Sequence, residues 1–348
     1  NTPLRCVLRL HVPVGSHAKK DNNMEMIFEK HKSVRRKPAN IVDNDILLFK
    51  HEFEKEIRGT HLIEISNGLI YNDIIINSLN LKKYLSYSLL QPIGYKSILK
   101  RLQTRRFRKK SEGVWIIDNW SSGYFHWITD ALPRLLASNR IKENLPVLLP
   151  ESYSHINYVT ESLNLLGKDV YYYNTSIGLI VKKLFLPSHT ANTGNYNHVL
   201  INELRDKFIG HIKTNGTRKV FISRLKAPKR KISNEGEVVD FLESHNWEIH
   251  YFEDYSFKKQ IEIMSETKYL IGLHGAGLTN MLFMKDGGKV LELRNKTDNH
   301  NNCYFSLASE LNIEYYYQLN EGNSVETHTV DVEVDMDTLK KNIELMES

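Results

Sequence analysis

From residue 114 onward, the sequence alternates between short apolar runs and longer amphipathic segments, and this alternation constrains the fold most. Strands that alternate with helices of about 10 to 15 residues are typical of parallel sheets flanked by helices. The pattern occurs in two sets that meet at the polar hinge Asn215-Gly216-Thr217. We therefore expect an α/β protein with two Rossmann-like domains, residues 113–214 and 215–330, facing each other across a cleft.

Each set predicts its own strands and helices. In the first set we expect strands at 114–118, 146–149, 170–173 and 179–186, and helices at 124–140, 156–166 and 198–214. In the second set we expect strands at 219–223, 248–251, 269–273, 289–293 and 313–317, and helices at 235–245, 256–265 and 302–311.

The segments that flank the two sets differ from them. Residues 1–112 indicate an irregular, strand-rich N-terminal portion, because short β-like runs are separated by polar turns. These runs are Cys6–Val12, Ile46–Phe49, His61–Ile65, Gly68–Tyr71 and Asp73–Ile76. Residues 331–348 predict a C-terminal helix, 336–346, which would cross back to the first domain.

Composition limits the function classes. The 348 residues carry a formal net charge of +6, which suits an anionic ligand but is too small an excess to indicate a nucleic-acid-binding protein. Cys6 and Cys303 are the only cysteines, which favours a reducing compartment and provides no metal-ligand cluster. Lys96–Lys110 predicts a basic amphipathic helix, for which a solvated face and a peripheral membrane contact both remain open.

The most informative single stretch is Lys268–Arg294. It predicts a strand, a glycine turn at His274-Gly275-Ala276-Gly277, a helix from Leu278 to Met284, and a second strand that carries Glu292. We expect the glycines to permit positive φ and close approach, and the helix N-terminus to bind an anion. The candidate ligand-binding residues are His274, Gly275, Ala276, Gly277, Leu278, Thr279, Asn280 and Glu292, the last through ribose hydroxyls. The glycine spacing, GxxGxG, differs from the dinucleotide fingerprint GxGxxG, which weakens a dehydrogenase interpretation. The alternative to ligand binding is that the glycine residues serve only to form the turn.

A second candidate site is a histidine and a carboxylate in the segment Gly123–Arg134. His126 and Asp130 lie four residues apart, so on a helix they share one face. The carboxylate could orient the imidazole for general-base catalysis. A surface hydrogen bond is the alternative, but the pair follows a strand end, and Pro133 inside the helical pattern indicates a functional kink.

Two arginines form the third candidate. Arg224 follows the strand Phe221-Ile222-Ser223, and Arg230 lies in the loop beyond it. Arginine suits bidentate phosphate recognition, although an ordinary basic loop remains possible. The first set contains no Asp-x-Asp motif for a divalent metal, and Asp43-Asn44-Asp45 lies in the irregular N-terminal portion. We therefore expect arginines and a helix dipole, in place of a metal, to neutralise phosphate charge.

The segments GYFHWITDALPRLL, VFISR, RKISNE, GLHGAGLTNMLFM and VLEL resemble the family 61 glycosyltransferases over about residues 114–320. That family includes plant xylan transferases, animal O-GlcNAc- and O-mannose-modifying enzymes, and bacterial capsule or lipopolysaccharide enzymes. The resemblance implies a GT-B fold, an inverting reaction and a nucleotide-sugar donor, usually UDP-linked. The family often has a small residue where Phe125 stands, a departure that bears on the acceptor side.

Together these features predict an inverting, metal-independent glycosyltransferase without cofactor. It would move a sugar to a glycan or lipid-linked glycan acceptor in bacterial surface polysaccharide synthesis, at the cytoplasmic face of the inner membrane. His126 and Asp130 would be catalytic, and Arg224 and Arg230 would join the glycine turn in holding the donor. A non-catalytic nucleotide- or glycan-binding protein on the same scaffold is the alternative.

Overall fold

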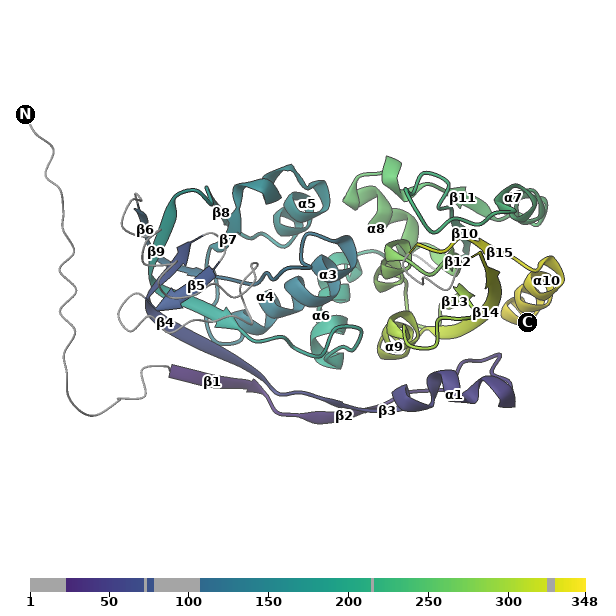
Figure 1. Cartoon of the computed structure of the whole chain (residues 1–348), viewed down its shortest axis with the longest axis horizontal. Helices are drawn as coiled ribbons and strands as arrows, with labels where there is room; N and C mark the ends of the chain where they lie inside the picture. The colour runs from purple at the N-terminus through teal and green to yellow at the C-terminus, as the bar shows by residue number, and fades with distance from the viewer. Residues whose placement is uncertain (1–22, 72–73, 78–106, 214–215, 324–328) are drawn as a thin grey trace, which may run out of the picture.

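The computed structural model describes residues 23–71, 74–77, 107–213, 216–323 and 329–348. It is a mixed α/β structure elongated along one axis, with two halves that are each built around one large sheet (Figure 1). This agrees with the α/β class expected from the sequence.

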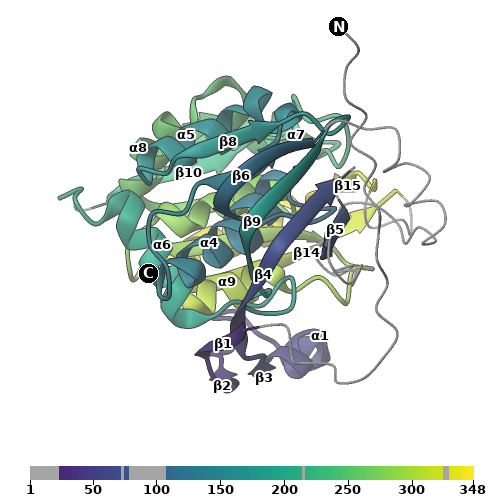
Figure 2. The same ribbon diagram turned by 90° about the vertical axis from the view of Figure 1, so that its left-hand side faces the viewer.

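The first sheet has a parallel part and an antiparallel part. Its strands, in spatial order, are β1 (Asn23–Phe28), β4 (Thr60–Tyr71), β9 (Gly178–Pro187), β6 (Phe107–Val114), β7 (Val147–Pro150) and β8 (Val170–Tyr173), with β5 (Ile74–Asn77) paired to β4. Strands β9, β6, β7 and β8 are parallel, whereas β4 is antiparallel to β9. Figure 2 looks onto this sheet, with α4 (Leu132–Asn139) and α6 (His198–Ile209) behind it. The four residues of β7 are all buried, as is typical of a central parallel strand.

The second sheet is almost entirely parallel. Its strands, in order, are β11 (Glu248–His250), β10 (Arg218–Ile222), β12 (Thr267–Leu273), β13 (Lys289–Asn295), β14 (Glu314–Gly322) and β15 (Val332–Glu333). Only β15 is antiparallel to its neighbour. The remaining helices are α3 (Tyr124–His126), α5 (Asn157–Leu165), α7 (Glu235–Ser244), α8 (Phe257–Ser265), α9 (Cys303–Glu310) and α10 (Met336–Glu347).

Each sheet contains one point at which the strand order reverses. In the first sheet the chain runs from β6 outward to β7 and β8, and then returns to place β9 on the other side of β6. In the second sheet β11 lies on one side of β10, and β12 to β14 lie on the other. Loops leaving the two central strands at such a switch point diverge, and this leaves a crevice at the carboxyl ends where ligands bind in open α/β sheets.

The N-terminal segment contacts both halves. The antiparallel pair of β2 (His31–Val34) and β3 (Glu54–Ile57) leads into β4 of the first sheet (Figure 1). Between these two strands, Phe49 of α1 (Ile46–Phe49) packs on Phe305 and Tyr317 of the second half. The sequence prediction of a strand at Ile46–Phe49 is wrong. Four consecutive apolar residues have no distinguishing period, and Asp43 and Asp45 before them favour a helix N-terminus.

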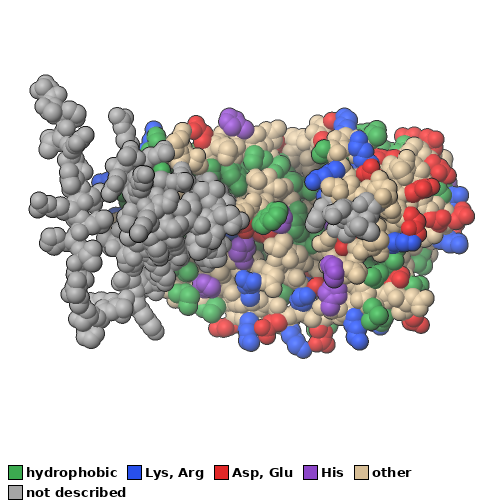
Figure 3. Space-filling model, viewed as in Figure 1, with side chains coloured by type: hydrophobic (Ala, Val, Ile, Leu, Met, Phe, Trp, Pro, Cys, Tyr) green, Lys and Arg blue, Asp and Glu red, His purple; other side chains and the backbone are tan. Residues whose placement is uncertain are grey.

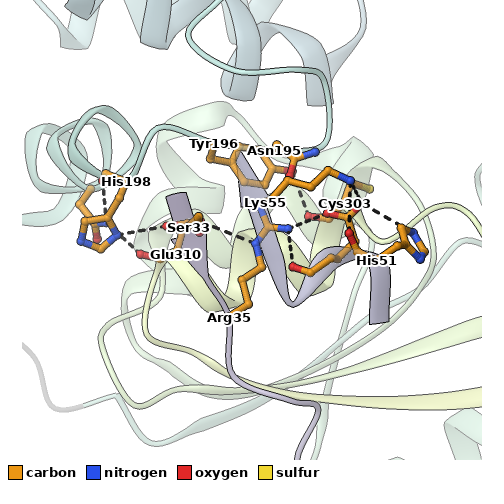
Figure 4. A network of polar contacts seen from close by, with 11 residues as sticks. Ser33, Arg35, His51, Lys55, Asn195, Tyr196, His198, Cys303 and Glu310 are labelled. Carbon is orange, nitrogen blue, oxygen red and sulfur yellow. Dashed lines mark hydrogen bonds and ion pairs between the residues drawn. The ribbon is translucent and has the colours of Figure 1, made fainter. Parts of the chain in front are cut away.

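A buried arginine holds this segment in place. The Arg35 guanidinium donates to Glu52 at 2.6 Å and to Asn195 at 2.7 Å, and it lies 3.7 Å from Glu310 of α9 (Figure 4). Asn195 belongs to the loop after β9 in the first half, whereas Glu310 belongs to the second half. Because the Arg35 side chain is fully buried, losing any of these partners would leave part of its charge unsatisfied. Arg35 therefore fixes the loop after β9 relative to α9.

Three other expectations need correction. The first parallel strand ends at Val114, so residues 115–118 form the loop beyond it. The described end of the expected basic helix, Phe107–Lys110, lies in strand β6, whereas residues 96–106 and the expected strand Cys6–Val12 lie outside the described residues. Helix α10 packs its Leu339, Ile343 and Met346 into the core of the second half, in the same cluster as Tyr316 of β14. The expected crossing of this helix to the first half is not seen.

Candidate functional site

His126 lies just beyond the switch point of the first sheet. Its Nδ1 donates to Asp130 Oδ2 at 2.8 Å, and Thr193 of the loop after β9 also reaches that oxygen, at 3.4 Å. Asp130 is 7% exposed and the His126 side chain is 24% exposed. A carboxylate on Nδ1 fixes the tautomer in which Nε2 carries the free lone pair. The predicted pair therefore forms, and it presents a base to solvent.

The helix that carries this pair is irregular. Residues Trp127–Ala131 form a π-helical segment between α3 and α4, and Pro133 lies in the first turn of α4. A π-helical turn widens the helix by one residue per turn and is frequent at functional sites. Proline has no N–H to donate, so it tolerates a position where the regular hydrogen-bond ladder is interrupted. The helix is therefore irregular just before Pro133, over Trp127–Ala131, and the functional kink expected at Pro133 itself stays a prediction.

The same switch point holds a second histidine–carboxylate pair that the sequence analysis missed. His189 Nε2 lies 3.2 Å from Asp118 Oδ2, and Asp118 Oδ1 accepts from the Trp120 backbone N–H at 2.9 Å and from Ser121 Oγ at 3.0 Å. Burial alone would raise the pKa of Asp118. The bonds from His189 and Trp120 and the charge of Arg134 outweigh burial, and they hold this pKa well below its usual value.

The sequence alone indicates where Asp118 and His189 each lie relative to a strand, but it does not indicate that they form a pair. Asp118 and His189 each follow an apolar run, which is a signal for the carboxyl end of a strand. Their meeting depends on β9 returning to the side of β6, where Trp115 N–H donates to Phe185 C=O at 2.9 Å. No local pattern specifies that return.

The two predicted arginines meet at the switch point of the second sheet. Arg224 follows β10, and its Nε and Nη2 donate to the backbone carbonyls of Arg230 and Lys229 at 2.8 and 2.9 Å. Burial lowers the pKa of Arg224, and the nearby charge of Arg230 lowers it further. Arg230 adopts a left-handed backbone with φ of 59°, and its Nε is buried without a hydrogen-bond partner. A pair of partly buried cations with a free donor is suited to a bound anion.

The glycine turn fits against these arginines in an unexpected way. Gly275 has φ of 163°, which is extended backbone, and Gly277 is not among the positive-φ residues, so the expected positive φ is wrong at both. A Cβ on Gly275 would collide with the Arg224 guanidinium, and one on Gly277 would lie 3.0 Å from Ile222. Both glycines therefore serve close approach of side chains from β10 and its loop.

The segment after the turn is a 3-10 helix, Ala276–Phe283, in place of the expected α-helix. Leu278, Thr279 and Asn280 are buried within it, and Asn280 is bonded to Tyr124 and to the Gly277 carbonyl. The burial of these three side chains disfavours the expected contacts between them and a nucleotide-sugar donor. A crevice beside the turn is lined by Ser223, Arg224, Phe252, Glu253 and Gly277, among others.

Glu292 pairs with the histidine of the turn. One carboxylate oxygen bonds His274 Nδ1, and the other accepts from Tyr315 Oη at 2.5 Å. Glu292 is fully buried. Both oxygens are occupied, which disfavours the expected ribose contact, and Glu292 instead orients His274. The His274 side chain remains 15% exposed.

The two switch points are joined by direct contacts. Tyr124 Oη, two residues before His126, donates to Asn280 Oδ1 of the 3-10 helix at 2.6 Å. The Phe125 ring touches both His126 and Tyr304, with centroids 5.1 and 5.8 Å apart, and Tyr304 touches His274. Figure 3 shows several histidine side chains near the middle of the long axis, where the halves adjoin. The structure therefore joins the segment that carries His126 to the segment of the glycine turn.

A metal centre is not evident in the described part of the chain. No group of three or more His, Cys, Asp or Glu side chains is arranged to hold an ion there. Asp45 of the Asp43-Asn44-Asp45 sequence accepts a hydrogen bond from Tyr317 Oη at 2.7 Å, which ties it to β14.

Comparison with known proteins gives a family match over the same region. Residues 124–291 match the model of the family Glycosyltransferase 61. That range includes His126, both arginines and the glycine turn. The match supports family 61, and with it a glycosyltransferase, as the class to which the fold and site are related.

Among individual proteins, this chain is similar to the EGF domain-specific O-linked N-acetylglucosamine transferase of several animals. It is 37% identical to the dog protein over 91 residues, 35% to the rat protein over 105 residues and 35% to the Drosophila melanogaster protein over 101 residues. These alignments cover 25, 29 and 28% of this chain and 17, 20 and 19% of those proteins. The chain spans about a fifth of the relatives it matches, and these animal proteins do not support the expected bacterial branch.

Proposed function

We propose that this protein is an inverting glycosyltransferase that uses a nucleotide-sugar donor. The observation that carries the proposal is that the segment bearing the His126–Asp130 pair contacts the segment after the glycine turn, through the hydrogen bond from Tyr124 to Asn280. The glycine turn in turn packs against Arg224. The histidine–carboxylate pair can accept a proton and the arginine pair can hold a diphosphate. Transfer from a nucleotide-sugar to a hydroxyl requires the base and the diphosphate site to lie on either side of the same reacting carbon.

The donor diphosphate would bind at the second switch point. Arg224 and the unpartnered Nε of Arg230 supply positive charge and donors, and Gly275 leaves room for the Arg224 guanidinium. An anion there would relieve the repulsion between the two cations. His274, held by Glu292, would contact the phosphates or the donor sugar. UDP is the nucleotide that the family resemblance suggests.

The acceptor would be activated by His126. Its Nε2 takes the proton of the acceptor hydroxyl as that oxygen forms a bond to the anomeric carbon. The bond between that carbon and the diphosphate oxygen breaks at the same time, and the nucleoside diphosphate leaves with the electron pair. A single displacement of this kind inverts the anomeric centre. Asp130 stabilises the imidazolium that forms.

The finer assignments come from resemblance and stay proposals. The relatives' name suggests N-acetylglucosamine as the first sugar to try, and the two sheets with opposed sites suit a GT-B arrangement. A glycan or lipid-linked glycan acceptor and a bacterial surface-polysaccharide role rest on the sequence resemblance alone. No described helix has the length and apolar character needed to cross a membrane. A cytoplasmic location and a peripheral membrane contact remain predictions.

Catalysis without metal is also part of this proposal. The arginines and the glycine turn would balance the leaving diphosphate, so EDTA should leave transfer largely intact. Complete loss of transfer in EDTA that manganese restores would contradict this part of the account.

The proposal is tested by a ligand screen followed by a turnover assay. UDP, GDP, CMP and NAD are each added to the purified protein, and the melting temperature is measured. A ligand at 100 times its Kd stabilises the folded state by about 2.7 kcal/mol, so UDP should raise the melting temperature. Release of UDP from UDP-N-acetylglucosamine and other UDP-sugars then separates a transferase from a non-catalytic binding protein. Stabilisation by NAD alone would point to a dehydrogenase.

A further inference from the structure

The loop between β6 and α3 presents an exposed indole. Trp120 is 68% exposed, whereas Trp115, Trp127 and Trp247 are buried. Exposed apolar residues are common singly on protein surfaces and need no explanation by themselves. Trp120 differs because of where it lies and how firmly its loop is held.

The position of Trp120 is fixed by its own backbone. Its N–H donates to Asp118 Oδ1 at 2.9 Å, its carbonyl accepts from Gly123 N–H at 2.8 Å, and Ser121 Oγ accepts from Asp118 N–H at 2.9 Å. His189 holds the other oxygen of Asp118. The exposure of the indole is therefore a property of an ordered turn.

The indole also lies against the proposed base. Its ring centroid is 5.7 Å from that of His126, with an angle of 35° between the planes. Both side chains follow β6 at the switch point of the first sheet, the place where open α/β sheets bind ligands. Asp118, which accepts from the Trp120 backbone N–H, and its partner His189 have side chains that are 14% and 23% exposed.

We propose that Trp120 is the platform on which the acceptor's sugar ring packs, which places one of its hydroxyls at His126. A pyranose has an apolar face of C–H groups and a polar rim of hydroxyls. An indole offers a large flat apolar surface with little entropy to lose, and the His126 ring that lies against it can bond a hydroxyl. This inference rests on the proposed function, and it identifies the acceptor's reacting end as a pyranoside.

The distribution of tryptophans provides a direct assay. Iodide quenches only exposed indoles, so the quenched part of the fluorescence reports Trp120, and Trp120→Phe should abolish it. Methyl pyranosides of glucose, galactose, mannose and N-acetylglucosamine are then added with UDP present. At least one should reduce iodide quenching in the wild-type protein. Leu345→Ala, an exposed apolar residue on α10, should show the same protection as the wild type.

The kinetic consequence follows from the same contact. For a pyranoside that protects, Trp120→Ala should raise the acceptor KM at least tenfold with a smaller change in kcat, and Trp120→Phe should restore part of the loss. A fall in kcat alone would instead make Trp120 a positioning residue for His126 and overturn the platform. Protection by N-acetylserine or N-acetylthreonine methylamide and by no pyranoside would overturn it too, as would no protection by any compound. If UDP still binds the wild-type protein by calorimetry in those cases, the proposed function stands while this inference fails.

Discussion

The two switch points of this protein share the same strand topology but carry different side chains. Each lies between neighbouring parallel strands, β6 and β9 in one sheet and β10 and β12 in the other, and each carries a histidine held by a carboxylate. At the first, His126 stands beside an exposed indole, and Thr193 shares its carboxylate partner. At the second, two arginines crowd a glycine turn. Under the proposed function, similar backbone topology would serve proton transfer in one half and anion binding in the other.

Burial separates the two histidines. Asp130 keeps slight exposure, and His126 is a quarter exposed, so its free nitrogen can exchange protons with a hydroxyl. Glu292 is completely buried and is shared with Tyr315, so the carboxylate that holds His274 belongs to the core. The two pairs therefore differ in accessibility: the His126 side chain is 24% exposed, whereas the His274 side chain is 15% exposed and is held by a fully buried carboxylate.

The largest expected effect comes from removing the proposed base. His126→Ala should lower turnover by about 10²- to 10⁴-fold, the usual worth of general-base help. UDP affinity should hardly change, because the proposed diphosphate site belongs to the other sheet. Turnover and calorimetric UDP binding are measured on the same preparation. His155→Ala, which removes an exposed histidine from the turn after β7, is the control. Near-normal turnover in His126→Ala would assign the pair a structural role, and His189 or His274 would become the candidate.

Unlike the His126 variant, the arginine variants should lose UDP affinity. Arg224→Ala or Arg230→Ala should each weaken UDP binding by about 1.5 to 3 kcal/mol, the worth of a hydrogen bond to a charged group. Lys229→Ala removes a positive charge from the same exposed loop and should cost far less. Calorimetric titration of the three variants decides the matter. Unchanged affinity in both arginine variants would move the diphosphate away from this switch point.

Gly275→Ala tests whether the glycine turn is needed for space. The new methyl group would displace the Arg224 guanidinium, so UDP binding should weaken by about 1 to 2 kcal/mol, within the usual cost of overpacking. Gly236→Ala, where a Cβ meets no atom within 4 Å, is the control. In the Arg224→Ala background the Gly275→Ala change should add almost nothing. Full additivity of the two changes would show that the glycine acts by another route.

The smallest effect concerns stability at the first switch point. Asp118→Asn should lower the free energy of unfolding by about 1 to 2 kcal/mol at pH 7. Because the folded pKa of Asp118 lies below the unfolded value of about 3.9, its contribution is complete above that value and is lost as pH falls further. The gap between wild type and variant in urea unfolding should therefore shrink between pH 5 and pH 2. Asp206→Asn, an exposed aspartate, should show no such gap. A gap that stays constant with pH would contradict a charged role for Asp118.

Sequence patterns predicted the parts of this protein that depend on local spacing. The His126–Asp130 pair follows from helical geometry, and Arg224 and the glycine turn follow from strand ends. The Asp118–His189 pair and the Arg35 network could not be predicted, because their members are joined by strand order and by a distant N-terminal segment. The positive φ expected at Gly275 was wrong for a related reason, since a glycine required by a distant side chain looks the same in sequence as one required by a turn.

The claim that UDP binds at the second switch point and not at the first is tested most directly by hydrogen–deuterium exchange with and without UDP. The account predicts that UDP slows exchange of backbone amides in residues 223–231 and 274–283, around the arginines and the glycine turn. Residues 118–122 and 188–193, at the first switch point, should exchange as before. Protection confined to the first switch point, or absent from both arginine and glycine segments while UDP binds, would contradict the central claim.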